Sequence, residues 1–395
     1  MRPARDRGFS LIEAVIAAGL LTVVSASVFG LVNPARRSFA AEPEVADLQQ
    51  RLRVGADTLT KDLLMAGAGA YLGSHTGALT RYFAPVLPFR AGARSNDPPG
   101  TFATDRITFT YVPTTASQTT TVAECAPGVR TIEAATDGSC PLGVSRCGLA
   151  KGMSVLVFDD TGNHDLFTVV SVAGNSAQVA ASRPAGMATV TYAAGAKVVE
   201  AVSGTYFLKT DDATGTYQLM RSDGTTNADA TVVDHVVGLR FDYDGEPNPP
   251  AMLKPVSETT GPWTTYGPPP PPPEVQLTAY PAGENCTFLL DRDGNHVPRL
   301  AVLGSGPPAL VPLTAAQLTD GPWCPDATSP SRWDADLLRI RRISVTLRVE
   351  AAAAALRGPA SVLFSHGGTS RDGVRWVPDQ EVRFQVSPRN LNLGR

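Results

Sequence analysis

The sequence lacks the short motifs that mark common catalytic sites. It has no Gly-x-Ser-x-Gly and no His-Glu-x-x-His motif. Its five histidines are scattered along the chain, as His75, His164, His235, His296 and His366. A catalytic site needs a nucleophile or a metal ion with a base and an oxyanion donor within reach. We therefore expect neither enzyme activity nor a cofactor.

Long runs of basic residues are also absent. The 34 lysines and arginines nearly balance the 37 aspartates and glutamates, which gives a formal net charge of -3. A nucleic-acid-binding domain usually carries a clustered positive charge. We therefore expect no nucleic acid among the partners of this chain.

Cysteine is rare and never forms a C-x-x-C pair, which argues against a zinc site or a thioredoxin-like redox centre. In an oxidising compartment Cys286 and Cys324 are the natural disulfide pair. Cys125, Cys140 and Cys147 then leave one thiol over. Pairing of Cys140 with Cys125 or with Cys147 stays open, because sequence spacing does not give the distance between Cα atoms.

One long apolar run, from Phe9 to Val32, contains Glu13 as its only charged residue. At 1.5 Å per residue a helix of this length covers roughly 36 Å, enough to cross the ~30 Å hydrocarbon core of a bilayer. Arg2, Arg5 and Arg7 precede the run. By the positive-inside rule, the N-terminus stays in the cytoplasm and the residues after the run lie on the far side.

Three interpretations of this run are open. An ordinary secretory signal would use the small residues 25–27 as its cleavage site. A plain membrane anchor would carry Glu13 at a cost of about 2.5 to 3.5 kcal/mol near the middle of the membrane. Cleavage between Gly8 and Phe9 would instead place a positive α-amino group four residues from Glu13. The carboxylate would then serve its own helix dipole or the amine of a neighbouring subunit.

The residues around this junction, RGFSLIE from Arg7 to Glu13, resemble the class III leader junction of type IV prepilins and type II secretion pseudopilins. The resemblance implies that a prepilin peptidase cleaves after Gly8 and that the new N-terminus at Phe9 is methylated. It also implies that Glu13 serves subunit assembly. Gly30 and Pro34 are helix breakers that predict a weakened or kinked helix in this part of the chain.

The chain after the apolar run predicts one amphipathic helix and many strands. Apolar residues at spacings of three and four favour a helix over 33–66 that packs on a sheet: Val45, Leu48, Leu52, Ala56, Leu59 and Leu63. Alternating or β-branched runs predict strands within 106–112, 153–160, 166–174, 236–245, 338–350 and 381–391. We expect the strand at 338–350 to lay one face on the helix, and residues 159–163 to form a hairpin turn.

Two insertions are predicted in this β-rich part. Residues 125–199 have their own turns and three cysteines, which indicates an inserted lobe. Residues 247–273 form a Pro/Gly-rich surface loop that ends in six consecutive prolines. Asp291, Asp293 and Asn295 alternate in a pattern that is a calcium candidate, since hard cations bind oxygen ligands. A simple Asp-Gly turn is favoured there, and no metal site is expected, because the glutamate of a calcium loop is missing.

Taken together, the sequence predicts a pilin-like α+β fold, with a long N-terminal hydrophobic helix packed on an antiparallel sheet and a large β-rich head with insertions. The expected parts are a leader (1–8), a transmembrane and filament-core helix (9–32), an amphipathic helix (33–66) and an extracytoplasmic head (67–395). The leucine-rich helix followed by β-rich sequence resembles the minor-pilin family usually called PilW and, less closely, the J-type minor pseudopilins.

This resemblance implies a single-pass inner-membrane protein with a periplasmic head that later enters a pilus or pseudopilus. The implied partners are a prepilin peptidase, other minor and major pilins, and the inner-membrane assembly platform. The head is too bulky to repeat along a slender fibre, so we expect a position at the tip or a role in initiation. A minor pseudopilin of a type II secretion system and a surface-binding module on a pilin stalk are the alternatives.

Overall fold

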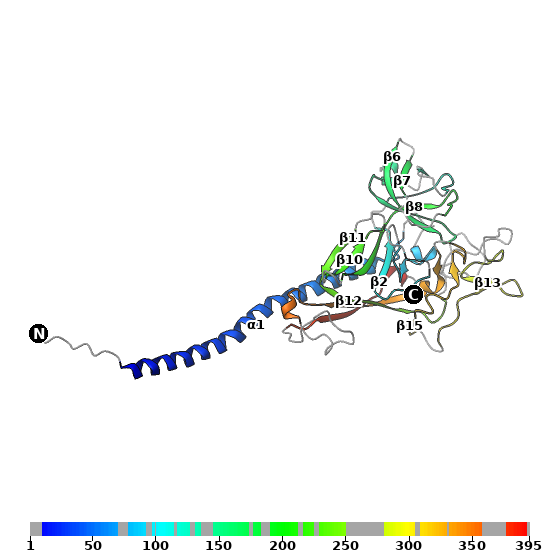
Figure 1. Ribbon diagram of the computed structural model, residues 1–395. Helices are drawn as coiled ribbons and strands as arrows, with labels where there is room; N and C mark the ends of the chain where they lie inside the picture. Colours follow the sequence, from blue (N-terminus) through cyan, green and yellow to red (C-terminus); the bar gives the residue numbers. More distant parts are fainter. Residues whose placement is uncertain are drawn as a thin grey trace, which may run out of the picture. The chain divides into compact units, whose positions relative to one another are not determined.

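Figure 1 shows the fold in a computed structural model of the chain. The structure describes residues 10–69, 78–91, 97–98, 100–113, 117–126, 131–135, 145–173, 177–182, 190–211, 216–224, 229–249, 280–304, 309–329, 332–357 and 377–392. A long N-terminal helix precedes a body rich in antiparallel sheet, so the α+β class is confirmed. The chain forms two compact units, one of residues 1–51 and 350–380 and one of residues 52–349 and 381–395.

The helix, α1 (Leu11–Met65), is one continuous element of 55 residues. Its helical backbone runs through Gly30 and Pro34, where the sequence predicts a weak point, and through Pro43. The chain leaves the helix at Gly67, whose φ of +80° is a conformation that glycine adopts without strain. The membrane-type and amphipathic segments therefore belong to the same helix.

Two antiparallel sheets form the centre of the larger unit. The five-stranded sheet has the order β1 (Val86–Leu87), β2 (Arg106–Tyr111), β9 (Val202–Asp211), β10 (Thr216–Ser222) and β11 (Asp229–Asp234). The four-stranded sheet has the order β15 (Val311–Leu313), β12 (Val236–Gly245), β18 (Ile340–Val349) and β19 (Gln380–Val386). Strand β11 leads into β12 through His235, which has a φ of +59°. The chain thus passes from one sheet to the other within a single residue.

The last turns of α1 pack on both sheets. A Cβ atom built on Gly55 would lie 2.6 Å from Leu347 Cδ2 of β18 and 3.5 Å from Val233 Cγ2 of β11, so the helix backbone approaches closely. One turn further on, Leu59 is fully buried. The part of the predicted apolar stripe around Leu59 therefore belongs to the face that contacts the sheets, and the strand predicted at 338–350 lies against the helix as expected.

A second β structure lies between β2 and β9 in the sequence. Its six strands have the order β3 (Gln118–Thr120), β8 (Lys197–Glu200), β5 (Ser154–Phe158), β6 (His164–Ala173), β7 (Ala177–Ser182) and β4 (Thr131–Ala134). Thr121 and Ala134 form an antiparallel bridge, and Ala135 N donates a 2.8 Å hydrogen bond to Thr120 O. The first and last strands therefore also pair, and the sheet closes into a small barrel.

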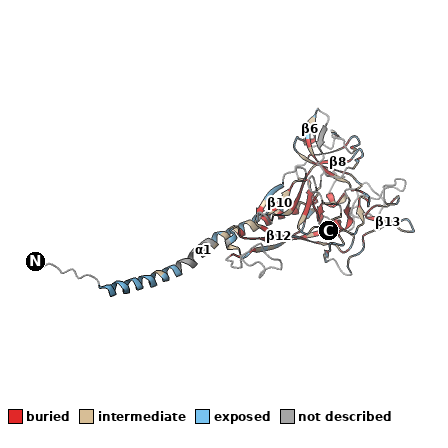
Figure 2. Cartoon of the chain, viewed as in Figure 1, coloured by how far each residue is buried: buried red, intermediate tan, exposed pale blue. Residues whose placement is uncertain are grey.

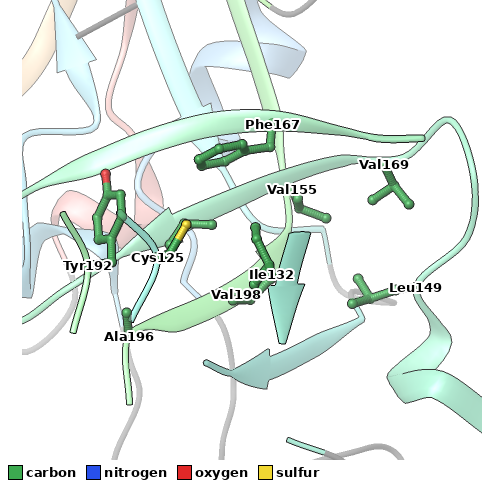
Figure 3. Close-up of a cluster of buried hydrophobic side chains, with 10 residues drawn as sticks. Cys125, Ile132, Leu149, Val155, Phe167, Val169, Tyr192, Ala196 and Val198 are labelled. Atoms are coloured by element: carbon green, nitrogen blue, oxygen red, sulfur yellow. The ribbon is translucent and has the colours of Figure 1, made fainter. Parts of the chain in front are cut away.

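The interior of this barrel is apolar (Figure 3). Val155, Phe167 and Val198 come from three different strands and are all buried in one cluster. Tyr192 joins this cluster and donates a 2.9 Å hydrogen bond from its hydroxyl group to buried Asp165. The barrel thus has a core of its own, within residues that overlap the lobe predicted at 125–199.

The barrel is inserted without disturbing the five-stranded sheet. Tyr111, the last residue of β2, lies opposite Val202, the first residue of β9. Beside this pair, Glu200 N donates a 2.6 Å hydrogen bond to Ser117 O. The two ends of the insertion are therefore direct neighbours.

Smaller elements complete the described chain. They are two short strand pairs, β13 (Phe288–Leu290) with β14 (His296–Pro298) and β16 (Trp323–Cys324) with β17 (Trp333–Asp334), and the 3₁₀ helices η2 (Leu79–Arg81), η3 (Ser145–Gly148), η4 (Ala335–Arg339), η5 (Ala354–Leu356) and η6 (Arg389–Leu391). Most of the predicted proline-rich loop, residues 250–273, lies outside the described residues.

Candidate functional site

The exposed N-terminal part of α1 is the candidate functional site. Leu11–Gly30 is a 20-residue stretch that is long and apolar enough to cross a membrane, and it is unburied (Figure 2). At 1.5 Å per residue it covers ~30 Å, the thickness of a bilayer core. The large apolar side chains exposed along it are Leu11, Ile12, Val15, Ile16, Leu20, Leu21, Val23, Val24, Val28 and Phe29. An apolar surface of this extent needs lipid or protein to cover it.

Two hydroxyl groups within this stretch are paired with its own backbone. Thr22 Oγ1 lies 2.8 Å from Gly19 O and 3.0 Å from Ala18 O, and it donates to these carbonyl groups. Ser27 Oγ donates a 2.9 Å hydrogen bond to Val23 O. Hydroxyl groups paired in this way can lie in an apolar medium without leaving a donor unsatisfied.

Glu13 closes the first turn of the helix together with Ser10. Glu13 Oε2 accepts hydrogen bonds from Ser10 N at 2.9 Å and from Ser10 Oγ at 3.0 Å, and Glu13 N donates to Ser10 Oγ at 3.3 Å. This reciprocal arrangement is a capping box, which satisfies amide groups that a helix N-terminus otherwise leaves unpaired. Glu13 therefore has a role within its own chain. Gly8 and Phe9, the predicted cleavage and methylation sites, lie outside the described residues.

Small residues recur at every fourth position of the exposed stretch. They are Ser10, Ala14, Ala18, Thr22, Ala26 and Gly30. Residues four apart are neighbours on a helix surface, so these six positions form a continuous strip that winds slowly around the helix, by about 40° per step. Small side chains allow the backbones of two helices to approach each other closely in a membrane.

A buried polar contact holds the other end of α1 against the sheet. Asp62 Oδ2 accepts hydrogen bonds from the Tyr206 hydroxyl group at 2.8 Å and from Arg221 Nε at 3.0 Å. The apolar pattern of this helix does not predict the contact, because a charged residue such as Asp62 is expected on the exposed side of an amphipathic helix. No feature of the sequence distinguishes Asp62 from those exposed neighbours.

The two cysteines predicted to pair, Cys286 and Cys324, form a disulfide bond, with their Cα atoms 5.2 Å apart. Both are buried. Cys147 is also disulfide-bonded, and Cys125 belongs to the apolar core of the barrel. Cys140, the other cysteine of the predicted lobe, lies outside the described residues.

The calcium candidate forms a hairpin turn. Asp291 Oδ1 accepts hydrogen bonds from Asp293 N at 2.9 Å and Asn295 N at 2.8 Å, and Asp291 Oδ2 accepts one from Asn295 Nδ2 at 3.2 Å. The same contacts recur in the predicted turn at 159–163, where Asp159 accepts from Thr161 N and Asn163 N. In both turns an aspartate carboxylate organises the backbone, which accounts for the motif without a metal ion.

A different acidic cluster lies beside the β16–β17 strand pair. Asp320, Asp334 and Asp336 have carboxylate oxygens within 4.8 Å of one another, the one three-residue group of possible metal ligands among the described residues. Asp334 already accepts hydrogen bonds from Gly321 N at 2.7 Å and Asp336 N at 2.8 Å, and Asp336 pairs with Arg339. Burial, with the nearby Asp336 and Asp320, raises the pKa of Asp334 to about 7.

His164, His235 and His296 belong to no such cluster in the described part of the chain, and His75 and His366 lie outside it. No protein-family model matches the chain, and no curated protein sequence is detectably similar to it.

Proposed function

We propose that this chain is a minor pilin of a type IV pilus system, which waits in the inner membrane and then takes part in initiating the filament or forming its tip. The observation that carries the proposal is the continuity of α1. One helix presents an exposed apolar stretch, Leu11–Gly30, and its last turns then pack on the sheets of a β-rich body. A cleaved signal peptide has no need of such continuity with the folded body.

The membrane stage rests on the chemistry of the exposed stretch. Its backbone is helical, Thr22 and Ser27 donate hydrogen bonds to its own carbonyl groups, and Glu13 is its only charge. The arginines that precede it hold the N-terminus in the cytoplasm, which places the body in the periplasm. A prepilin peptidase then cleaves between Gly8 and Phe9, and the new amine at Phe9 is methylated.

The assembly stage rests on the strip of small residues. In a filament the apolar helices of neighbouring subunits form the core, and small side chains let these helices pack closely. Each contact joins two different faces, so the assembly extends without closing on itself. The partners are other minor and major pilins together with the inner-membrane assembly platform.

The chain has an assembly function, not a catalytic one. The inserted barrel makes the subunit bulky. If such a subunit were repeated along a slender fibre, adjacent copies would clash sterically. A place at the tip avoids this conflict, because a tip subunit occurs once in each filament.

The test is to express the full chain with a leader tag in a cell that makes pili, and to recover sheared filaments. We expect a mature N-terminus at Phe9 in N-terminal mass analysis and enrichment of the chain with other pilins. Ala18→Leu, within the strip of small residues, should reduce this recovery, whereas Ala17→Leu on the adjacent side of the helix should reduce it less. A mature chain that begins at Val28 would show that the segment is an ordinary signal peptide, and the proposal would be wrong.

A further inference from the structure

The barrel rests on the rest of its unit through one aromatic cluster. The side chain of His164, the first residue of β6, stacks on Phe83, with ring centroids 4.0 Å apart and an angle of 8° between the planes. Phe158 lies opposite His164 in the barrel and contacts Tyr82 and Phe83 edge-on, at centroid distances of 4.8 and 5.9 Å. The β5–β6 end of the barrel is thereby held against residues 79–83, which we call the η2 segment.

The turn between β5 and β6 adds a second point of contact. The indole nitrogen of buried Trp333 donates a 3.4 Å hydrogen bond to Gly162 O. A Cβ atom on Gly162 would lie 3.2 Å from Tyr82 O, so the backbone of the turn already touches the η2 segment. Rings and backbone dominate this contact surface, and Lys197 of β8 also lies on it, with its Nζ 5.7 Å from the centroid of the Tyr82 ring.

His164 is the one group in this aromatic surface that can gain a charge in mildly acidic conditions. Its Nδ1 is buried and has no hydrogen-bond partner among the described residues. Burial lowers the pKa of His164 to about 4, against a smaller raising influence of the Gly162 backbone. The imidazole is therefore neutral while the contact is closed at neutral pH.

The acidic groups near His164 are already engaged. On the turn, Asp159 accepts hydrogen bonds from Thr161, and Asp160 pairs with Lys197 of β8 at 2.8 Å. On β6, Asp165 accepts a hydrogen bond from Tyr192. From the η2 segment the titratable or charged groups are the hydroxyl of Tyr82, whose pKa burial raises to about 12, and Arg81. Only burial and the Gly162 backbone shift the pKa of His164, so none of these carboxylates acts as a counter-ion to it.

We propose that the His164–Phe83 stack is an acid-sensitive latch, whose protonation releases the β5–β6 end of the barrel and exposes the aromatic cluster beneath it. An imidazolium ion in this contact would be buried without an anion, whereas in the released state it is hydrated. The attraction between a cation and the Phe83 ring offsets part of that cost, but burial dominates the balance.

The test uses the full chain in detergent micelles and measures hydrogen exchange by mass spectrometry at pH 7.5 and pH 5, corrected for the intrinsic rate. With the ordinary pKa of 6.5 in the open state and about 4 in the closed state, the opening constant should rise about 30-fold at pH 5. Peptides that cover 79–83 and 158–167 should lose protection, whereas peptides from β9 and β10 should keep it.

Two variants remove the titrating group in different ways. His164→Phe keeps a ring against Phe83, and His164→Gln keeps a polar side chain. Both should lose the acid-dependent opening, even if His164→Gln opens more at pH 7.5. His296→Gln, at a histidine outside the aromatic cluster, is the control and should open as the wild type does. The proposal is wrong if the wild type keeps its protection at pH 5, or if either folded variant still opens about 30-fold.

Discussion

Tyr206 on β9 donates a 2.8 Å hydrogen bond from its hydroxyl group to Asp62 on α1. Tyr206 is fully buried, and burial together with the nearby Asp62 raises its pKa. Arg221 of β10 pairs with the same carboxylate oxygen at 3.0 Å. The negative charge of Asp62 is thus shared by one neutral and one charged donor, and this contact fixes the rotation of the helix on the sheet.

Removing this carboxylate should destabilise the unit strongly. Asp62→Ala leaves Tyr206 and Arg221 without their acceptor, and we expect a loss of about 2 to 3 kcal/mol in the free energy of unfolding, reduced because Arg221 is partly solvent-exposed. Tyr206→Phe should cost about 1 kcal/mol. Urea unfolding of the full chain in detergent measures both. Asp57→Ala, at an exposed position of the same helix, should change the stability by less than about 0.5 kcal/mol; equal effects at positions 57 and 62 would refute this prediction.

Two roles of Glu13, capping its own helix and pairing with the amine of a neighbouring subunit, can be separated by mutation. Glu13→Gln keeps an acceptor for Ser10 but removes the charge, so the helix should still begin at the same residue. Leader cleavage and membrane insertion should be unchanged, because losing a charge makes insertion easier. If the carboxylate meets the amine of a neighbouring subunit, recovery in sheared filaments should fall sharply.

Ser10→Ala is the matched control for this experiment. It removes the cap at a cost of about 1 kcal/mol of helix stability but keeps the Glu13 charge. Assembly should then survive. If Glu13→Gln is recovered at the wild-type level while Ser10→Ala is not, Glu13 acts only within its own chain.

The two aspartate turns offer a direct comparison of glycines. Gly162 and Gly294 occupy the same place in their turns, with φ values of +95° and +79°. An alanine at Gly294 would meet no neighbour within 4 Å, so it should cost only the backbone strain of about 1 to 2 kcal/mol. At Gly162 the added methyl group would also lie 3.2 Å from Tyr82 O. In thermal unfolding, the midpoint temperature of Gly162→Ala should therefore be lower than that of Gly294→Ala. The reverse order would mean that the barrel does not pack on the η2 segment.

The raised pKa of Asp334 predicts a pH dependence of stability. Because the folded pKa of about 7 exceeds the ordinary 3.8, Asp334 favours folding most below pH 4, and this contribution is lost as the pH rises through 7. Asp320→Asn removes one neighbouring charge that raises this pKa. The variant should match the wild type near pH 4 and gain up to about 1 kcal/mol at pH 8. Urea unfolding between pH 4 and 8 measures the difference; the exposed variant Asp293→Asn should show no such gain.

Local patterns in the sequence predict much of this fold. The apolar run, the stripe at Leu59, the strand that contains Leu347 and the turn that begins at Asp159 all depend on residues close together in the chain. The closure of the barrel does not, because Thr121 and Ala134 pair through a register that alternation alone cannot set. The burial of Asp62 likewise depends on a contact between distant segments, with Tyr206 and Arg221.

The candidate site divides in the same way. The exposed apolar stretch and the position of Glu13 can be predicted from the sequence, and the disulfide between Cys286 and Cys324 is predicted if the chain folds in an oxidising compartment. The sequence alone does not decide whether the Glu13 carboxylate has a partner within its own chain. The structure shows that it accepts hydrogen bonds from Ser10, three residues away. The assembly role of Glu13 remains a prediction.

The way in which the barrel joins the sheet suggests how such a protein can change over evolutionary time. Tyr111 and Val202 would face each other across an ordinary two-residue hairpin if the barrel were replaced by a short turn. A lineage could gain or lose this domain in one recombination event, with the rest of the sheet unchanged. The surface that the protein displays can then diversify by exchange of whole modules, while the long helix is preserved.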